Sequence, residues 1–369
     1  MKKISVGILG ATGVVGQQYI KRLIDHPWFD ITYLAASVQS AGKSYGQAVE
    51  GRWRLPEALP ENIKNCYVHS INQVREASKL CTILFSAIDT QTAKIWEPQF
   101  AEAGLIVISN ASAYRNDDAV PIIIPEINAD HLKLVQRQKE LKGWKGGLLV
   151  KPNCTVQSYL LPLHAIHQKA PIKRAIVTTM QAVSGAGYPG VASLDCLDNI
   201  VPYIAGEEDK CASEPLKIWG TLNADSIEPA KYPIFSVHCN RVPITDGHTS
   251  CVSFEFLDEK LDQDEIIELW KTFEGPPQSL QLPSAPKKPL IYRIENDRPQ
   301  PRLDRDSENG MAVTMGRLRP CPVFDWRFVT LSHNTARGAA GGGVLNAELF
   351  IRSSQEEFQE ATMNLALSR

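Results

Sequence analysis

A cysteine that directly follows a predicted strand is the residue of this sequence with the clearest chemical potential. Cys154 lies in a Pro-Asn-Cys-Thr segment between the apolar run 147–150 and a helical pattern at 155–168. A thiol at a helix N-terminus feels the positive end of the helix dipole, which lowers its pKa and favours the nucleophilic thiolate. The sequence therefore predicts that Cys154 is a covalent nucleophile.

A proton partner and an anion clamp occur together in a later segment, from Arg241 to His248. His248 follows a turn and precedes a run with strand character, so it is a candidate acid/base for the thiol. The Arg241 guanidinium has the geometry to bind a carboxylate with two hydrogen bonds. Sequence alone does not show that either residue meets Cys154.

The pattern along the chain predicts the scaffold that must position these residues. As far as residue 150, short β-rich runs alternate with longer amphipathic stretches, which is typical of a doubly wound, mostly parallel α/β sheet of the Rossmann type. Strands are expected at 4–9, 31–35, 82–87, 105–109 and 147–150, with helices at 15–25 and 90–102. Strands at 175–180 and 249–257 then indicate a second, α+β domain.

We place the boundary between the two domains at the candidate nucleophile. The first domain is expected at residues 1–153, completed by a C-terminal helix at 334–369, and the second, catalytic domain at 154–333. The proline-rich region 275–306 is expected to be a long ordered loop on the surface or at an interface.

A glycine-rich loop after the first strand points to a dinucleotide. Glycines there permit a tight turn and a close approach of backbone N–H groups to a pyrophosphate, which the helix N-terminus also favours. The spacing is G-x-x-G-x-x-G instead of the common G-x-G-x-x-G, so the loop's position between strand and helix carries the assignment. The expected contacts are Gly10, Thr12, Gly13, Val14, Val15 and Gly16.

The end of the second strand predicts NADP as the cofactor. An NAD site usually has an acidic residue there, which binds the ribose 2′-hydroxyl. Here Ser37, Ser40 and Lys43 follow the strand, and their hydroxyl and ammonium groups suit the additional phosphate of NADP. An ordinary solvated loop is the alternative interpretation of these three residues.

Composition excludes several other classes of protein. Lys plus Arg number 39 and Asp plus Glu 41, so the formal charge of −2 offers no broad basic field for nucleic acid or an anionic membrane. No apolar run approaches the roughly 20 residues of a membrane-spanning helix. The 8 dispersed cysteines include no C-x-x-C pair, so we expect a cytoplasmic protein without a disulfide framework or a metal site.

In their order along the chain, these motifs resemble the aspartate-β-semialdehyde dehydrogenase family. The resemblance covers nearly the whole chain, and in detail the sequence resembles the archaeal and fungal branch of the family. It rests on the glycine loop, the Pro-Asn-Cys-Thr segment, Gln181 with the residues around it, Glu214-Pro215-Leu216-Lys217, Arg241 to His248, Asn334-Thr335 and Arg337-Gly338-Ala339-Ala340-Gly341.

The resemblance implies a reaction and its catalytic residues. The reaction is the NADPH-dependent reduction of L-4-aspartyl phosphate to L-aspartate 4-semialdehyde and phosphate, through a thioester on Cys154. This step belongs to the biosynthesis of lysine, through diaminopimelate, and of threonine and methionine. His248 would be the acid/base, and Gln181 would orient the intermediates. Assembly as a homodimer or homotetramer through the second domain is also implied.

The resemblance further implies how the substrate and cofactor are held. Arg241 would bind the α-carboxylate, Glu214 the α-ammonium, and Lys217 and Arg115 the phosphate. Further contacts would come from Asn153 to the substrate and from Ser86, Ser184, Gly185 and Asn346 to the cofactor.

Alternatives remain open for the residues and for the function. Glu214 and Lys217, three residues apart, would also suit a surface ion pair, and Arg115 could pair with the acids beside it. A malonyl-CoA reductase shares the scaffold and the cysteine chemistry, although it needs no ammonium and phosphate contacts. An N-acetyl-glutamyl-phosphate reductase and a non-catalytic NADP sensor are more distant alternatives.

Overall fold

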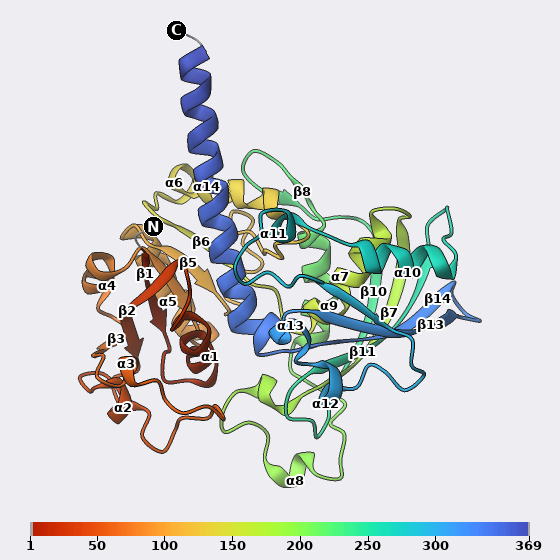
Figure 1. Cartoon of the computed structure of the whole chain (residues 1–369), viewed down its shortest axis with the longest axis horizontal. Coiled ribbons are helices and arrows are strands. Elements are labelled where there is room, and N and C mark those ends of the chain that lie inside the picture. Colours follow the sequence, from red (N-terminus) through yellow and green to blue (C-terminus); the bar gives the residue numbers. More distant parts are fainter. Residues whose placement is uncertain (1–2, 368–369) are drawn as a thin grey trace.

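Two β-sheets form the body of the protein, and the C-terminal helix extends beyond them (Figure 1). The structure is a computed structural model that describes residues 3–367, with the side chains of residues 3–354. Within this range no helix is both long and apolar enough to cross a membrane.

The first sheet is parallel throughout and has the strand order β3-β2-β1-β4-β5-β6. This order is the one found in dinucleotide-binding folds, which place ligands where the strand order reverses, beside β1 and β4. The prediction of a Rossmann-type sheet is confirmed. Its strands are β1 (Ile4–Leu9), β2 (Phe29–Ala36), β3 (Val68–Ser70), β4 (Ile83–Ser86), β5 (Ile106–Ser109) and β6 (Gly147–Val150).

Helices cover both faces of this sheet because successive strand side chains point to opposite sides. Val6 packs in one core with Tyr19 of α1 (Val14–Leu23) and Val344 of α14 (Gly341–Leu367). Leu84 packs in the other core with Phe100 of α5 (Thr90–Glu102). The remaining helices here are α2 (Tyr45–Ala48), α3 (Glu61–Lys64), α4 (Val74–Leu80), α6 (Lys133–Lys142) and the 3₁₀ turn η1 (Ala129–Leu132).

The second sheet is mixed, with the order β10-β7-β11-β14-β13-β12. Its outer pairs β10–β7 and β12–β13 are parallel, and the pairs between them are antiparallel. This sheet confirms the predicted second α+β unit. Its strands are β7 (Ile172–Gln181), β10 (Ile234–Arg241), β11 (His248–Phe256), β12 (Leu290–Arg293), β13 (Val313–Pro320) and β14 (Trp326–Ser332), and β8 (Thr221–Leu222) pairs separately with β9 (Ile227–Glu228).

Helices α7 (Val156–His167), α9 (Glu207–Ile218) and α10 (Gln263–Thr272) pack against strands of the second sheet. The expectation of a long loop at 275–306 is wrong in part, because this region contains an edge strand, β12, and two short helices. Pairing with β13 gives β12 the backbone hydrogen bonds that its sequence alone does not predict. These two helices are α11 (Pro276–Ser279) and α12 (Pro301–Asp304), and two more short helices lie outside the region, α8 (Ser193–Cys196) and α13 (Ser307–Gly310).

The chain returns from the second sheet to the first through a buried turn, η3 (Ala336–Ala340), that precedes α14. Arg337 anchors this turn by donating to both carboxylate oxygens of Glu126, at 3.0 and 2.9 Å. The Lys151 ammonium donates to Gly338 O at 3.0 Å, next to the candidate nucleophile. The last two residues of the predicted helix, 368 and 369, lie outside the described residues.

Candidate active site

Cys154 lies where β6 gives way to α7. Asn153 Oδ1 accepts a hydrogen bond from the Thr155 N–H at 2.7 Å, which forms a tight turn immediately before the helix. The Lys151 N–H donates to Ser109 O at 2.8 Å, so β6 and β5 stay paired up to this turn. The cysteine is therefore at the carboxyl edge of the parallel sheet, where open α/β folds place their ligands.

His248 meets the cysteine, although 94 residues separate them in sequence. Its Nε2 lies 3.2 Å from Cys154 Sγ, and its Nδ1 accepts a hydrogen bond from the Ala182 N–H at 3.1 Å. A neutral imidazole has one N–H, and a ring nitrogen that accepts a backbone hydrogen bond cannot carry it. The proton of neutral His248 is therefore on Nε2 and points at the sulfur.

Burial keeps both groups of this pair neutral. It lowers the pKa of His248 to about 3, and the nearby charges of Arg241 and His333 act in the same direction. It raises the pKa of the Cys154 thiol to about 11, with a further contribution from the negative charge of Glu207. The pKa of the thiol is therefore shifted in the direction opposite to the lowering expected from the helix N-terminus, with burial as the largest cause.

Gln181 and Arg241 are register partners at the ends of the parallel strands β7 and β10. The Arg241 Nη1 donates to Ala182 O at 2.6 Å, so Ala182 is held by Arg241 through its oxygen and by His248 through its nitrogen. Gln181 accepts from the Thr179 hydroxyl at 3.0 Å and donates to Glu207 Oε1 at 3.1 Å. The structure thus gathers the predicted residues Gln181, Arg241 and His248 around one backbone turn.

Gly185 closes this turn over the histidine and the arginine. A Cβ atom at Gly185 would lie 3.0 Å from Arg241 Nη1 and 3.2 Å from His248 Cε1, which is tighter than ordinary packing. Ser184, beside it, accepts from Asn334 Nδ2 at 2.8 Å, and Asn334 Oδ1 accepts from the Gly247 N–H at 2.9 Å. Asn334 therefore connects the turn to the residue that precedes His248.

Arg115 and Glu214 form a buried ion pair. The Arg115 Nη1 lies 2.8 Å from Glu214 Oε1, and Glu214 Oε2 accepts from the Asn153 N–H at 2.6 Å. Arg115 thus pairs with Glu214 and not with the acids beside it in sequence. Both oxygens of Glu214 already have strong donors, so the structure differs from the expectation that this carboxylate is open to a substrate ammonium.

Lys217 has a different environment from the predicted one. Its ammonium donates to the carbonyl oxygens of Arg115, Asp117 and Val120 at 2.8, 2.6 and 2.9 Å. These bonds use all three of its N–H donors, and burial lowers the pKa of Lys217 to about 8. Lys217 therefore fixes the loop that carries Arg115, and no N–H of its ammonium is left over for a phosphate in this arrangement.

A cavity of about 700 Å³ connects Cys154 to the glycine loop after β1. Gly10 has φ +73°, and a Cβ there would lie 2.5 Å from Ala87 O, so the turn requires glycine. Helix α1 begins with no side-chain cap and no acidic residue in its first turn, which leaves its N–H groups for an anion. Thr12, Gly13, Val14 and Val15 line the cavity, and these residues fit a dinucleotide. Gly16 lies beneath the turn, where a Cβ would be 2.2 Å from Gly10 O.

The predicted 2′-phosphate residues lie after β2 as expected, and a cation that the sequence analysis missed joins them. Ser40 Oγ accepts from Arg52 Nη2 at 2.9 Å, and Arg52 lines the cavity. Lys43 is exposed and donates to Gln39 O at 2.9 Å, while Ser37 is exposed beside it. The sequence pattern that could have indicated this role is the basic pair Arg52 and Arg54, but such a pair is also typical of an ordinary surface loop.

Two of the predicted cofactor contacts, Ser86 and Asn346, are buried away from the cavity. Asn346 is fully buried on α14, where its Nδ2 donates to Ile123 O at 3.4 Å. The helix begins only after η3, and its register turns this residue toward the first sheet. Ser86 ends β4 and is fully buried. Ser184 and Gly185 do line the cavity, together with Asn334.

Comparison with known proteins finds relatives that match nearly the full chain. The family models for the NAD-binding domain and the dimerisation domain of semialdehyde dehydrogenases match residues 5–135 and 163–337. The chain is 47% identical over 348 residues to an aspartate-semialdehyde dehydrogenase of Methanothermobacter thermautotrophicus, which covers 94% of this chain and 98% of the relative. The chain belongs to the aspartate-semialdehyde dehydrogenase family.

Fungal members of the family are similarly close. The Schizosaccharomyces pombe enzyme is 44% identical, over 94% of this chain and 98% of its own length. A crystal structure of the Candida albicans aspartate-semialdehyde dehydrogenase with NADP superposes with a TM-score of 0.85 at 39% identity and covers 94% of this chain and 98% of that one. The predicted resemblance to the archaeal and fungal members is therefore confirmed.

Proposed function

We propose that this protein reduces L-4-aspartyl phosphate to L-aspartate 4-semialdehyde and phosphate, with NADPH as the reductant. Membership of the family supports this, and the Candida albicans relative has been solved with NADP. The observation that carries the proposal is the 3.2 Å approach of His248 Nε2 to Cys154 Sγ, because Cys154 lines a cavity that continues to the glycine loop. The step serves lysine, threonine and methionine biosynthesis.

The chemistry begins when the Cys154 thiol loses its proton to solvent in the cavity and the resulting thiolate attacks the acyl carbon of the substrate. The C–O bond to phosphate breaks, and a thioester to Cys154 remains. NADPH, when bound along the glycine loop, supplies the hydride that reduces the thioester carbon. Collapse of the resulting tetrahedral oxyanion releases the aldehyde and returns the sulfur as thiolate.

His248 contributes a fixed N–H donor throughout this sequence. Since Nδ1 accepts from Ala182, the neutral ring donates through Nε2 to the sulfur, and we infer that it also stabilises the oxyanion that forms at the same carbon. Acting as a base toward the thiol would require breaking the bond to Ala182. The geometry thus favours a neutral donor over the acid/base role that the family resemblance implies.

For the substrate, we propose that Arg241 binds the α-carboxylate and Arg115 the phosphate. Arg115 lines the cavity beside Cys154, and a bidentate guanidinium suits a phosphate. Two residues hold Arg115 in place for this contact. Glu214 pairs with its guanidinium, and Lys217 donates to its main-chain oxygen. Asn153 shapes the turn at the sulfur, and Gln181 lies beside it on β7.

A comparison of two reactions tests this function. Phosphate-dependent NADP reduction with aspartate semialdehyde should exceed NADPH oxidation with malonyl-CoA by on the order of 10⁴-fold, because a site built to pair with charged groups strongly rejects a substrate that lacks them. Faster turnover of malonyl-CoA would show that the protein is the alternative reductase on the same scaffold.

Cofactor preference gives a separate prediction. Arg52→Ala should raise the dissociation constant for NADPH roughly 10- to 100-fold, the effect of losing a charge-assisted hydrogen bond to the 2′-phosphate, and change NADH binding little. Fluorescence titration of each nucleotide measures both constants without turnover. Lys43→Ala should act in the same direction, and Arg75→Ala, an exposed arginine on α4, is the control. Equal losses for NADPH and NADH would contradict the assignment.

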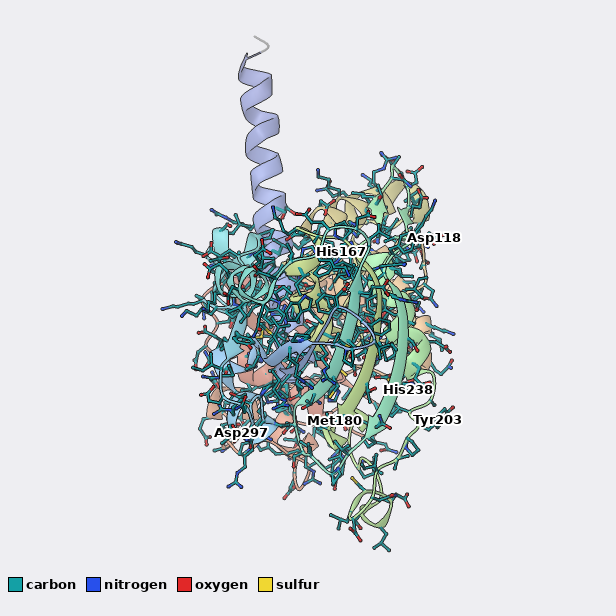
Figure 2. The ribbon with its side chains drawn as sticks, turned by 90° about the vertical axis from the view of Figure 1, so that its right-hand side faces the viewer. Asp118, His167, Met180, Tyr203, His238 and Asp297 are labelled. Carbon is teal, nitrogen blue, oxygen red and sulfur yellow. The ribbon has the colours of Figure 1, made fainter. Side chains whose placement is uncertain are left out.

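We also propose that the protein assembles as a homodimer or homotetramer through its second sheet. The dimerisation-domain match at 163–337 supports an oligomer. Exposed apolar side chains gather on this side, among them Ile176 of β7, Ile234 of β10 and Tyr203. Figure 2 shows Met180 and His238 on neighbouring strands there, with Tyr203 close by.

The domain division and the location of the protein remain proposals. Residues 1–153, with the C-terminal helix, would form the cofactor domain, and 154–333 the catalytic and dimerisation domain. The cofactor loop and the Cys154–His248 pair lie on the two sides of this division, which supports it.

A cytoplasmic location agrees with eight cysteines that are all free thiols.

A further inference from the structure

Arg54 and Tyr188 form a contact across the cavity that joins the glycine loop to Cys154. The Arg54 Nη2 donates to the Tyr188 hydroxyl at 2.8 Å, and the guanidinium carbon lies 4.2 Å from the centre of the tyrosine ring. Both residues line this cavity. In Figure 1 the loop between α2 and α3, which carries Arg54, meets the segment that precedes α8. The two side chains therefore bridge segments that lie far apart in the sequence.

One end of this bridge is fixed beside the glycine loop. The buried Gln17 side chain of α1 donates to Thr12 O at 3.0 Å and to Arg52 O at 2.9 Å. Its oxygen accepts from the Arg54 N–H at 2.8 Å. The main chain at Arg54 is therefore held next to the turn whose N–H groups suit a dinucleotide.

The other end follows a turn that packs on the catalytic histidine. Residues 184–187 line the same cavity, and a Cβ at Gly185 would lie 3.2 Å from His248 Cε1. Gly187 has φ +73°, a conformation that glycine adopts without strain, so the chain can turn just before Tyr188. The Tyr188 side chain is 64% exposed and lies at the rim of the cavity.

Two cavities meet at the Arg54–Tyr188 bridge. The second cavity has a volume of about 510 Å³, and its lining includes the apolar residues Val14, Pro56 and Leu197. Arg54 and Tyr188 line both cavities. The bridge therefore forms one side of the space along which a dinucleotide would extend from the glycine loop toward the nucleophile.

The exposure of this contact suits a part that opens and closes. Both side chains are exposed, and a cation–π contact at the surface is weak. Among the residues that the structure describes, neither side chain makes another hydrogen bond or ring contact. The bridge can therefore break to admit a nucleotide and form again after the nucleotide has bound.

We propose that the Arg54–Tyr188 bridge closes over the bound dinucleotide and slows its release. This inference rests on the proposed function, because it concerns the NADPH of that reaction. The two side chains would hold the cofactor in place at the rim of the cavity, away from the reacting atoms. Their removal should therefore act on the dissociation rate of the nucleotide.

The test follows the fluorescence of NADPH in stopped-flow binding and release experiments, which need no turnover. In Tyr188→Ala the dissociation rate constant should rise roughly 5- to 10-fold, as expected for the loss of a surface hydrogen bond together with a cation–π contact. The association rate constant should change by less than about 2-fold, since binding differences within one site are mostly differences in release. Tyr188→Phe keeps the ring and should show a smaller increase.

A pair of variants tests whether the two side chains act together. Arg54→Ala should release NADPH as fast as Tyr188→Ala, and the two changes combined should release it no faster, because the loss of either partner already breaks the bridge. The control is Tyr67→Ala, which removes an exposed tyrosine that lines neither cavity and should match the unmodified protein.

Three results would overturn the proposal. Unchanged release in Tyr188→Ala would leave the bridge as an incidental surface contact. Equal increases in the association and dissociation rate constants would make it a barrier to entry that does not hold the nucleotide. Additive effects of the two changes would show that the side chains act separately. Failure of the proposed function is a different result, in which the unmodified protein does not bind NADPH.

Discussion

Cys154→Ser should lower kcat by about 10⁴-fold or more, the scale on which enzymes lose activity with their nucleophile. A serine hydroxyl at this position has the same place in the turn after β6, but it is a far weaker nucleophile than a thiolate, and no base contacts it. Steady-state assays of phosphate-dependent NADP reduction measure the loss.

The control for this variant is Cys251→Ser, an exposed cysteine on β11 that should retain full activity. Nucleotide titration should show that Cys154→Ser binds NADPH like the unmodified protein. When the unmodified protein is mixed with the acyl phosphate substrate, mass spectrometry should find the acyl group on the peptide that contains residue 154. Undiminished turnover in Cys154→Ser would rule out the covalent mechanism.

The pH dependence of alkylation tests the protonation state of Cys154. Because the pKa of this thiol is raised to about 11 by burial, the thiolate is the minor form at pH 7, and its fraction grows tenfold with each pH unit below the pKa. Iodoacetamide should therefore react with Cys154 at a rate that still rises between pH 8 and 10. A plateau reached below pH 8 would mean that the helix N-terminus prevails over desolvation after all.

Most of the first sheet could be predicted from the sequence, because parallel strands are short apolar runs with helices between them. All five predicted strands are present, and the turn at Gly10 requires the backbone freedom that its glycine suggested. β3 and β12 escaped prediction because they are short edge strands, and the one neighbour with which each pairs supplies most of its stability.

The residue types of the site could be predicted from the sequence, but the contacts between these residues could not. That Gln181 and Arg241 are partners depends on the register of β7 with β10, which no spacing in the chain reveals. Glu214 and Lys217 both lie on α9, but the loop from Arg115 to Val120 takes up the donors of Lys217.

Long-range burial accounts for the rest of the difference. A helix N-terminus is visible in sequence, whereas the desolvation that raises the pKa of Cys154 and the approach of Glu207 depend on the packed second domain. Glu207 itself begins the acidic run 207–209, which resembles the ordinary first turn of a surface helix.

His248→Ala should lower kcat by roughly 10²- to 10³-fold, the usual loss when one preorganised donor to a transition-state oxyanion is removed. His248→Gln should retain more activity than His248→Ala, because its side-chain amide has an N–H that can replace the Nε2 donor. Thermal melts belong beside the kinetics, since the Ala182 N–H loses its acceptor in the alanine variant. If His248→Ala matches the unmodified protein in both kcat and melting temperature, the placement of this donor in the reaction is wrong.

The pH profile separates a neutral donor from an acid/base. A pKa lowered to about 3 means that His248 is charged only in strong acid and stays neutral from pH 5 to 9. The kcat/KM profile of the unmodified protein should accordingly show no ionisation near pH 6.5 that His248→Gln removes. An inflection there that disappears in the variant would instead identify His248 as a group that takes up a proton. That result would require the imidazole to give up the Ala182 hydrogen bond and carry its neutral-state proton on Nδ1.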